Sequence, residues 1–260
     1  MVGECNRMTN ENASQEIQYI LSAGRTGTVF ISKLFETYAP YITAEHEPAY
    51  SRYLMMMGNV RNDTGLFKSL TRRWSRTHQN AHFSKDKKYI EINPFLCPIT
   101  DTLPREGCRL KVLHLVRHPA DWSRSITSFK ASTKLRAIID YIPFAKPYPA
   151  PRPAGWGKLG SYEKGLWRWR WCNNNISALK DTADKYVLVR YEDLFSDDKI
   201  VQMEAIHKIF DVFDLPPPKE IPDAVLRKRV NPSPKAVFSE NKKAEKEICG
   251  ALAKEFNYAL

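Results

Sequence analysis

Five short apolar runs, alternating with helix-forming segments, constrain the fold of this chain most strongly. The runs cover residues 17–22, 41–44, 88–92, 109–116 and 185–190, and each has the length of a buried strand. Helices are predicted over residues 29–38, 63–83, 119–132 and 162–182. This alternation favours an α/β fold with a largely parallel sheet, whose ligands bind at the carboxyl ends of the strands.

A length of 260 residues suits one domain covering residues 1–260. The polar residues 1–16 lack the apolar region of a signal peptide and are expected to be flexible. No run approaches 18 consecutive apolar residues, so no membrane span is expected. The five cysteines are scattered and form no C-x-x-C pair, which indicates reduced thiols in a cytoplasmic protein.

Residues 141–160 interrupt the alternation with five prolines and several aromatic residues. A stiff, non-helical segment of this length is too long for a simple connection. Two interpretations remain open, a lid over an active site and a surface linker.

Positive charge is in excess, with 40 Lys and Arg against 29 Asp and Glu and a net charge of +11. A surplus of this size indicates an anionic partner, although it does not identify the anion.

The sequence Ser22-Ala-Gly-Arg-Thr-Gly-Thr28 connects the first predicted strand to the first predicted helix. Glycines at this position let the backbone approach an anion, which the loop and helix N–H groups then face. Arg25 adds a positive charge, and two threonine hydroxyls add donors. The loop is not a Walker A motif, since G-x-x-x-x-G-K-[ST] is absent. The alternative is a tight turn that binds nothing.

A second candidate anion site follows the run 109–116, which is the most apolar of the predicted strands. Arg117 stands at the strand end, and Ser125 lies eight residues later on a helix that Pro119 begins. An arginine and a hydroxyl in this arrangement suit a phosphate group. The alternative is an arginine that bonds only to neighbouring carbonyls.

Together, these two motifs resemble those of sulfotransferases that use 3′-phosphoadenosine 5′-phosphosulfate (PAPS). The first is similar to their 5′-phosphosulfate loop and the second to their 3′-phosphate motif, including the arginine-to-serine spacing. The sequence Val189-Arg-Tyr-Glu-Asp-Leu194 also resembles a strand-end motif of bacterial and membrane-bound members. The three motifs span most of residues 17–195, and the likeness is weak beyond them. It implies a P-loop-NTPase-like fold of three layers.

The resemblance also implies roles for individual residues. The residues that would hold the 5′-phosphosulfate are Gly24, Arg25, Thr26, Gly27, Thr28 and Val29. Arg25 would also neutralise charge on the leaving phosphate, where many relatives have lysine. Val29 replaces a threonine of many relatives and offers only its backbone N–H. Arg117 and Ser125 would bind the 3′-phosphate. Apart from the resemblance, Arg229 and Lys235 of the basic loop 227–235 are candidates for further contacts to the nucleotide, and a solvated turn is the alternative.

Sulfuryl transfer requires a base for the proton of the acceptor. Glu47, with His46 beside it, lies in a His-Glu-Pro sequence that resembles the site of the glutamate base in several bacterial sulfotransferases. The cytosolic relatives use a histidine at a later strand end, where this chain has Glu91 and Asn93. Glu47 is therefore the first candidate, followed by His46 and Glu91. An ordinary solvated or ion-paired carboxylate remains the alternative for each glutamate.

Two histidine pairs, His78 with His82 and His114 with His118, have a spacing of four residues that suits a metal. No carboxylate or cysteine completes a recognisable ligand set in the sequence, so no metal is expected. The aromatic residues of the segment 166–171 are expected to pack a helix on the core rather than to stack on bases.

The sequence thus predicts a PAPS-dependent sulfotransferase that acts by in-line displacement, with 3′,5′-ADP as the product. The expected acceptor is the hydroxyl or amine of a small natural product such as an alkaloid, and neither nucleic acid nor membrane is an expected partner. A nucleotide-dependent kinase is the alternative enzyme, disfavoured by the missing Walker lysine and the lack of a clear magnesium-binding aspartate. A nucleic-acid-binding protein is a further alternative, suggested by the charge but by no recognised motif.

Overall fold

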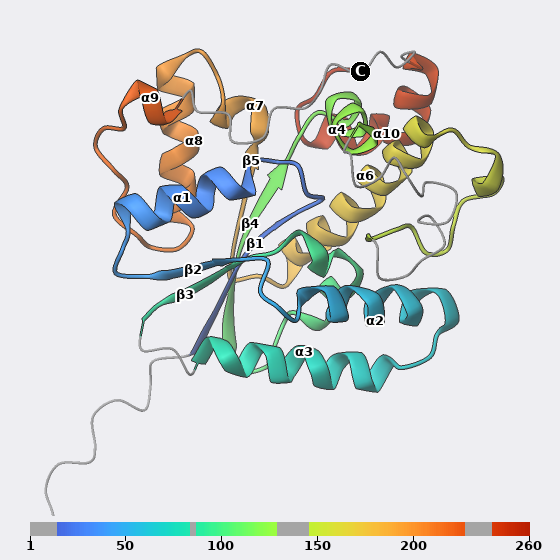
Figure 1. Cartoon of the computed structure of the whole chain (residues 1–260), viewed down its shortest axis with the longest axis horizontal. Helices are drawn as coiled ribbons and strands as arrows, with labels where there is room; N and C mark the ends of the chain where they lie inside the picture. Colours follow the sequence, from blue (N-terminus) through green and yellow to red (C-terminus); the bar gives the residue numbers. More distant parts are fainter. Residues whose placement is uncertain (1–14, 84–86, 129–145, 227–240) are drawn as a thin grey trace, which may run out of the picture.

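A central sheet of five parallel strands organises the molecule. The computed structural model describes residues 15–83, 87–128, 146–226 and 241–260. The strands are β1 (Gln15–Ser22), β2 (Thr43–His46), β3 (Tyr89–Ile92), β4 (Cys108–Val116) and β5 (Lys185–Arg190). They lie in the order β2-β3-β1-β4-β5, as Figure 1 shows. The predicted α/β fold with a parallel sheet is confirmed.

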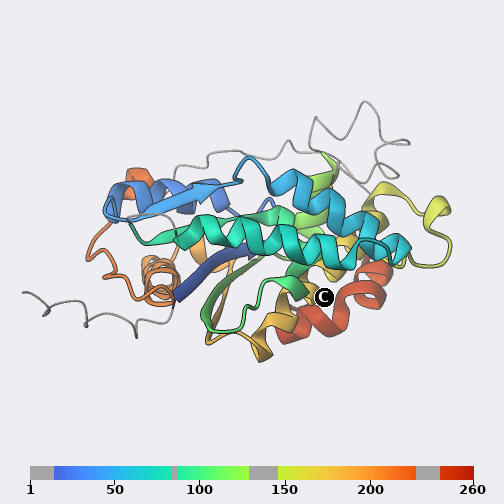
Figure 2. The same cartoon turned by 90° about the horizontal axis from the view of Figure 1, so that it is seen from below.

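Helices connect the strands and cover both faces of the sheet (Figures 1 and 2). The longer ones are α1 (Thr28–Tyr38), α2 (Ser51–Thr64), α3 (Lys68–Phe83), α4 (Pro119–Thr127), α6 (Ser161–Ser177), α8 (Lys199–Asp211) and α10 (Lys242–Glu255). Short elements are η1 (Pro94–Thr102), η3 (Trp156–Lys158), η4 (Ala178–Asp181), α7 (Tyr191–Leu194) and α9 (Asp223–Leu226).

Strand order places the end of β1 at the point where the chain changes direction across the sheet. After β1 the chain forms β2 and β3 on one side, and β4 and β5 then lie on the other. In the register of β1 and β4, Ser22 pairs with Leu115, so the segments that follow these two strands begin side by side. Such a switch point is where open α/β sheets bind their ligands.

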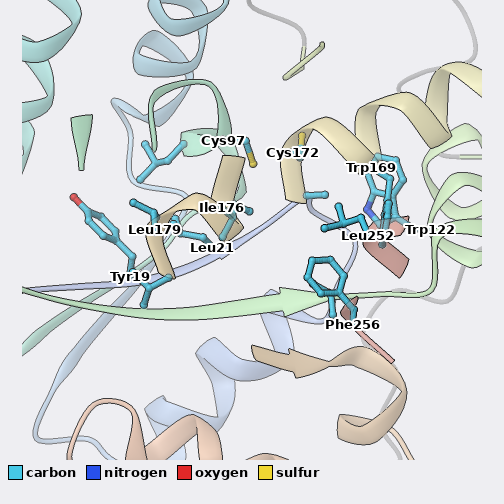
Figure 3. Packing of buried hydrophobic residues seen from close by; sticks show 14 of the residues in the cluster. Tyr19, Leu21, Cys97, Trp122, Trp169, Cys172, Ile176, Leu179, Leu252 and Phe256 are labelled. Carbon is cyan, nitrogen blue, oxygen red and sulfur yellow. The ribbon is translucent and has the colours of Figure 1, made fainter. Parts of the chain in front are cut away.

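Two apolar layers form because alternate side chains of each buried strand point to opposite faces. Ile20 of β1 packs with residues of α1 and α8 on one face. Tyr19 and Leu21 pack with η1, α6 and α10 on the other. Figure 3 shows Trp122 and Trp169 close together in this second cluster, with Phe256 nearby. The aromatic segment of α6 thus packs on the core as predicted.

Several predicted elements have different bounds in the structure. The helix expected over residues 63–83 is two helices, because Gly65 (φ 71°) ends α2 and Phe67 (φ 62°) also adopts a left-handed conformation before α3 begins. The strand expected over residues 41–44 is β2, shifted to Thr43–His46 by its pairing with β3. His46 therefore belongs to the strand, and Glu47 is the first residue beyond it.

Some expectations concern residues outside the described ranges. Residues 1–14 are outside them, but Gln15 and Glu16, which were expected to belong to a flexible terminus, form the start of β1. No helix among the described residues has the length and apolarity needed to cross a bilayer. Cys97, Cys108, Cys172 and Cys249 are free thiols, as expected for these four.

Candidate functional site

Left-handed backbone conformations shape the loop between β1 and α1. Gly24 (φ 82°), Arg25 (φ 56°) and Gly27 (φ 86°) all have positive φ, a combination that turns successive N–H groups towards one side. Gly27 precedes α1, and no side chain caps this helix end. Val29 is the second residue of α1, so its N–H is among the first-turn groups that lack an intrahelical acceptor. The loop has the geometry of an anion cradle.

The fold brings the two sequence motifs into direct contact. The Nε of Arg25 donates to the hydroxyl oxygen of Ser125 over 3.2 Å. Nη1 of Arg117 donates to the backbone carbonyl of Arg25 over 3.3 Å. Burial and the nearby positive charge of Arg117 lower the pKa of Arg25. The guanidinium groups of Arg25 and Arg117 thus lie close together, beside the hydroxyl of Ser125. Their combined positive charge would be stabilised by an anion.

Two buried polar atoms at this centre have no hydrogen-bond partner within the described part of the chain. They are the hydroxyl oxygen of Thr26, a residue only 1% exposed, and Nε of Arg117. An unmatched buried donor costs free energy unless a ligand or water satisfies it. Both donors fit phosphate or sulfate oxygens, which accept several hydrogen bonds.

Tryptophan side chains fix the backbone on either side of the positive centre. Nε1 of Trp122 donates to the carbonyl of Gly24 over 2.6 Å, and Nε1 of Trp169 donates to the carbonyl of Arg117 over 2.8 Å. Because both indoles are fully buried, they hold the loop and the end of β4 in a fixed relation.

The segment after β5 supports both motifs, a role that the sequence had not predicted. The guanidinium of Arg117 lies 4.4 Å from the centre of the Tyr191 ring. A carboxylate oxygen of Glu192 accepts from the N–H of His118 over 2.9 Å. The Phe195 ring lies so close to Gly27 that a Cβ there would come within 2.8 Å of it. The recurrent motif at 189–194 was visible in the sequence, but it gave no sign of these contacts.

His46 and Glu47 lie at the end of β2, on the side of β1 opposite to β4. Nε2 of His46 is hydrogen-bonded to Oγ1 of Thr28 over 2.9 Å, so β2 contacts the first residue of α1. Burial lowers the pKa of His46, although the neighbouring Glu47 opposes this change. Glu47 is half-buried and has φ 51°, a strained conformation held by a bond from its N–H to the carbonyl of Ile92.

Glu91 is brought into a different environment from Glu47. It is fully buried on β3, where its carboxylate bonds to His78, His82 and the amide of Asn93. Burial alone would raise the pKa of Glu91, but the hydrogen bonds from the two histidines lower it to about 2. Asn93 is also engaged, since it bonds Ser51 and caps η1. These contacts give no support to Glu91 as the base.

The remaining candidates are covered only in part. Arg229, Lys235 and residues 141–145 lie outside the described residues. Residues 146–149 contact α2 and α6, through bonds from Asn59 to the carbonyl of Lys146 and from Arg168 to that of Pro147. Tyr148, which is buried, donates to Asp63 over 2.8 Å. A lid formed by 141–160 remains a prediction.

Comparison with known proteins identifies the fold. No family model matches the sequence, and no curated protein matches it either. The sulfotransferase domain of the olefin synthase from Synechococcus PCC 7002 matches 98% of this chain and 100% of its own, at 17% identity and a TM-score of 0.53. Sulfotransferase STF9 from Mycobacterium avium matches 95% of this chain and 78% of its own, at 12% identity and a TM-score of 0.57. The chain therefore has the three-layer α/β fold of these sulfotransferase structures.

Proposed function

We propose that this protein is a sulfotransferase that transfers a sulfuryl group from PAPS to the hydroxyl or amine of a small molecule. The observation that carries the proposal is the contact between the two anion motifs, where Arg25 meets Ser125 and Arg117 meets the Arg25 carbonyl. This contact occurs at the switch point of a fold shared with two sulfotransferase structures.

The residues at this centre fit a ligand with phosphate groups at two positions. The loop N–H groups, Arg25 and the unpartnered hydroxyl of Thr26 would hold the 5′-phosphosulfate. Arg117, with its unpartnered Nε, and Ser125 would hold the 3′-phosphate. Arg229 and Lys235 remain proposed as further contacts of the nucleotide.

PAPS supplies a sulfuryl group joined to a phosphate leaving group, and no metal is required in the proposed scheme. Arg25 would stabilise the negative charge that grows on the phosphate. Glu47 would accept the proton of the acceptor, since it is half-buried at the sheet edge and its side chain is not committed to a salt bridge within the described residues. His46 would hold the Thr28 hydroxyl in place, and it remains the second candidate for the base.

The acceptor would bind beside Glu47, between the segments around residues 44–57 and 141–160. A small natural product with a hydroxyl or amine, alkaloids included, is the proposed class. A screen of such compounds with radiolabelled PAPS would identify the acceptor directly.

Nucleotide binding tests the proposal without knowledge of the acceptor. Isothermal titration is expected to detect 3′,5′-ADP and to give much weaker binding of 5′-ADP, which lacks the 3′-phosphate. Arg117→Ala should reduce the affinity for 3′,5′-ADP at least 100-fold, because it removes a charge-assisted contact to the 3′-phosphate. The difference in affinity between 3′,5′-ADP and 5′-ADP should become smaller in this variant. Equal affinity for both nucleotides, or preferential binding of ATP with Mg²⁺, would contradict the proposal.

A further inference from the structure

Three metal-ligating side chains meet on the face of the sheet that α3 covers. His78 and His82 are one helical turn apart on α3, and both point to Glu91 of β3. Figure 2 shows α3 running lengthwise across this side of the molecule. The sequence had suggested that no carboxylate completes a ligand set with this histidine pair. That expectation was wrong, because the fold brings Glu91 against both rings.

The three groups converge on one point. Oε2 of Glu91 lies 2.8 Å from Nε2 of His78 and 2.7 Å from Nε2 of His82. Their ligand atoms all lie within 4.8 Å of one another. The side chains of His82 and Glu91 are 2% and 0% exposed, and that of His78 is 11% exposed. Solvent therefore reaches the cluster from the side of His78.

We propose that His78, His82 and Glu91 bind one divalent transition-metal ion, for which zinc is the best match. Two imidazole nitrogens and one carboxylate oxygen are a ligand set that zinc accepts, and it leaves a position for water. Histidines four residues apart on a helix present both rings to one ion, as they do in known zinc motifs.

Ion binding requires these side chains to rearrange. Their present spacing is that of hydrogen bonds, whereas ligands of a tetrahedral zinc ion with bonds of about 2.0–2.1 Å lie about 3.3 Å apart. Each ring would thus move away from Oε2 by about half an ångström, and the two rings, whose ligand atoms lie within 4.8 Å of each other, would also move closer together. The ion would replace the two N–H groups that now donate to the carboxylate.

The surroundings also suit a dication. Glu45 of β2 pairs in register with Glu91, and its negative charge acts on His78. Two carboxylates can therefore balance the two charges of the ion while both imidazoles stay neutral. The amide of Asn93 donates to Oε1 of Glu91 over 2.6 Å, which leaves Oε2 directed at the histidines. Hydrogen bonds of this kind orient metal-ligating carboxylates.

An ion at this position would join α3 to the central sheet. Its effect would be on stability rather than on sulfuryl transfer, and the inference does not depend on the proposed function. An ion that binds only the folded state raises the free energy of unfolding in proportion to the logarithm of its concentration over Kd.

The test uses the full chain after removal of bound metal with a chelator. Titration with Zn²⁺ alone should give one ion per chain with submicromolar Kd and a higher melting temperature. His82→Gln and Glu91→Gln should each weaken binding at least 100-fold. His207→Gln, on the distant helix α8, is the matched control and should bind as the wild type does.

Spectroscopy of the wild type and a variant of the partly exposed His78 give further tests. Co²⁺ should give the intense visible absorption of a low-coordinate site, and zinc-edge absorption should detect two imidazoles, even if the buried variants do not fold. His78→Gln, at the solvent side, should lower the affinity and change the Co²⁺ spectrum. The absence of Zn²⁺ binding by the wild type would overturn the proposal and leave a hydrogen-bonded cluster. Zn²⁺ binding that persists in the folded ligand variants would overturn it as well.

Discussion

His46 and Thr28 join β2 to the start of α1 through a hydrogen bond of 2.9 Å between Nε2 and Oγ1. This bond connects the segment that carries the proposed base to the loop that carries the proposed phosphosulfate site. Loss of a partly buried hydrogen bond costs about 1–3 kcal/mol, which corresponds to about 5- to 150-fold in an equilibrium or a rate. The bond therefore offers a way to test whether the two segments act together.

Replacement of His46 by Phe, which cannot bond Thr28, is expected to lower kcat/KM for PAPS by about 10- to 100-fold. His46→Gln retains a polar group of similar reach and should lose less. Steady-state kinetics with the acceptor from the screen will measure both variants. Equal losses in the two variants would indicate that the imidazole acts as the base itself rather than through Thr28.

Glu47 gives a second prediction, since a base acts on turnover and not on nucleotide binding. Glu47→Gln removes the proton acceptor but keeps the shape of the side chain, so kcat should fall about 10²- to 10⁴-fold. The affinity for 3′,5′-ADP should stay within about twofold of the wild-type value on the same reasoning. Glu45→Gln, two residues earlier, is the matched control and should retain most of the turnover. Turnover that survives in Glu47→Gln would move the role of base to His46.

The stacking of Arg117 on Tyr191 gives a third prediction. Because a partly buried guanidinium on an aromatic face gains about 1–2 kcal/mol, Tyr191→Ala should weaken 3′,5′-ADP binding by about 5- to 30-fold. Tyr191→Phe keeps the ring and should bind nearly as well as the wild type. Titration calorimetry will distinguish the variants. A similar loss in both would assign the effect to the hydroxyl instead of the ring face.

The fourth prediction concerns Gly27, where conformation and packing both exclude a side chain. Its φ of 86° is unfavourable for alanine, and an added Cβ would lie 2.8 Å from the Phe195 ring. Gly27→Ala should lower the free energy of unfolding by about 2–4 kcal/mol. Gly65 has a similar φ of 71° with no atom within 4 Å of an added Cβ, so Gly65→Ala isolates the conformational part, about 1 kcal/mol. Urea unfolding will compare the two variants. Equal losses of unfolding free energy would show that contact with the Phe195 ring contributes nothing at Gly27.

Local sequence patterns were sufficient for most of the sheet and for the two anion motifs. The apolar run ending at Val116 predicted β4 because a buried strand needs apolar side chains on both faces. The two anion motifs were predicted from the residues that follow strands β1 and β4, but the direct contact of Arg25 with Ser125 was not predicted. The sequence analysis predicted no helix over residues 51–62, which belong to α2. The helix predicted over 63–83 ran through Gly65 because a single glycine does not by itself end a helix.

Contacts made by packing could not be predicted from the sequence. Glu91 meets His78 and His82 only because α3 lies over β3, and the histidine spacing says nothing about which strand the helix covers. Tyr191 reaches Arg117 because β5 lies beside β4, which depends on strand order. Strand order is determined by the whole chain. Local motifs can therefore identify the residues of the site, but they cannot identify the residues that support it from neighbouring strands.

His114 gives the last prediction, a dependence of stability on pH. Nδ2 of Asn173 donates to the Trp169 carbonyl, so Oδ1 of the same amide faces His114 and accepts from its Nε2–H. Nδ1 of His114 then accepts from the hydroxyl of Tyr186, and the neutral ring is satisfied on both sides. Burial lowers the pKa of His114 to about 4, although the bond to Asn173 opposes this change.

A histidine with a lower pKa in the folded state stabilises the fold above its unfolded pKa of about 6.5 and loses this contribution as the pH falls towards 4. The unfolded chain takes up the proton first over this range, so acid favours unfolding. The contribution of His114 should fall by about 2 kcal/mol between pH 8 and pH 5. The glutamine of His114→Gln cannot titrate. The free energy of unfolding of this variant should therefore fall by about 2 kcal/mol less than that of the wild type between pH 8 and pH 5. Urea unfolding at both pH values measures the difference, and parallel pH profiles would show that folding does not lower the pKa of His114.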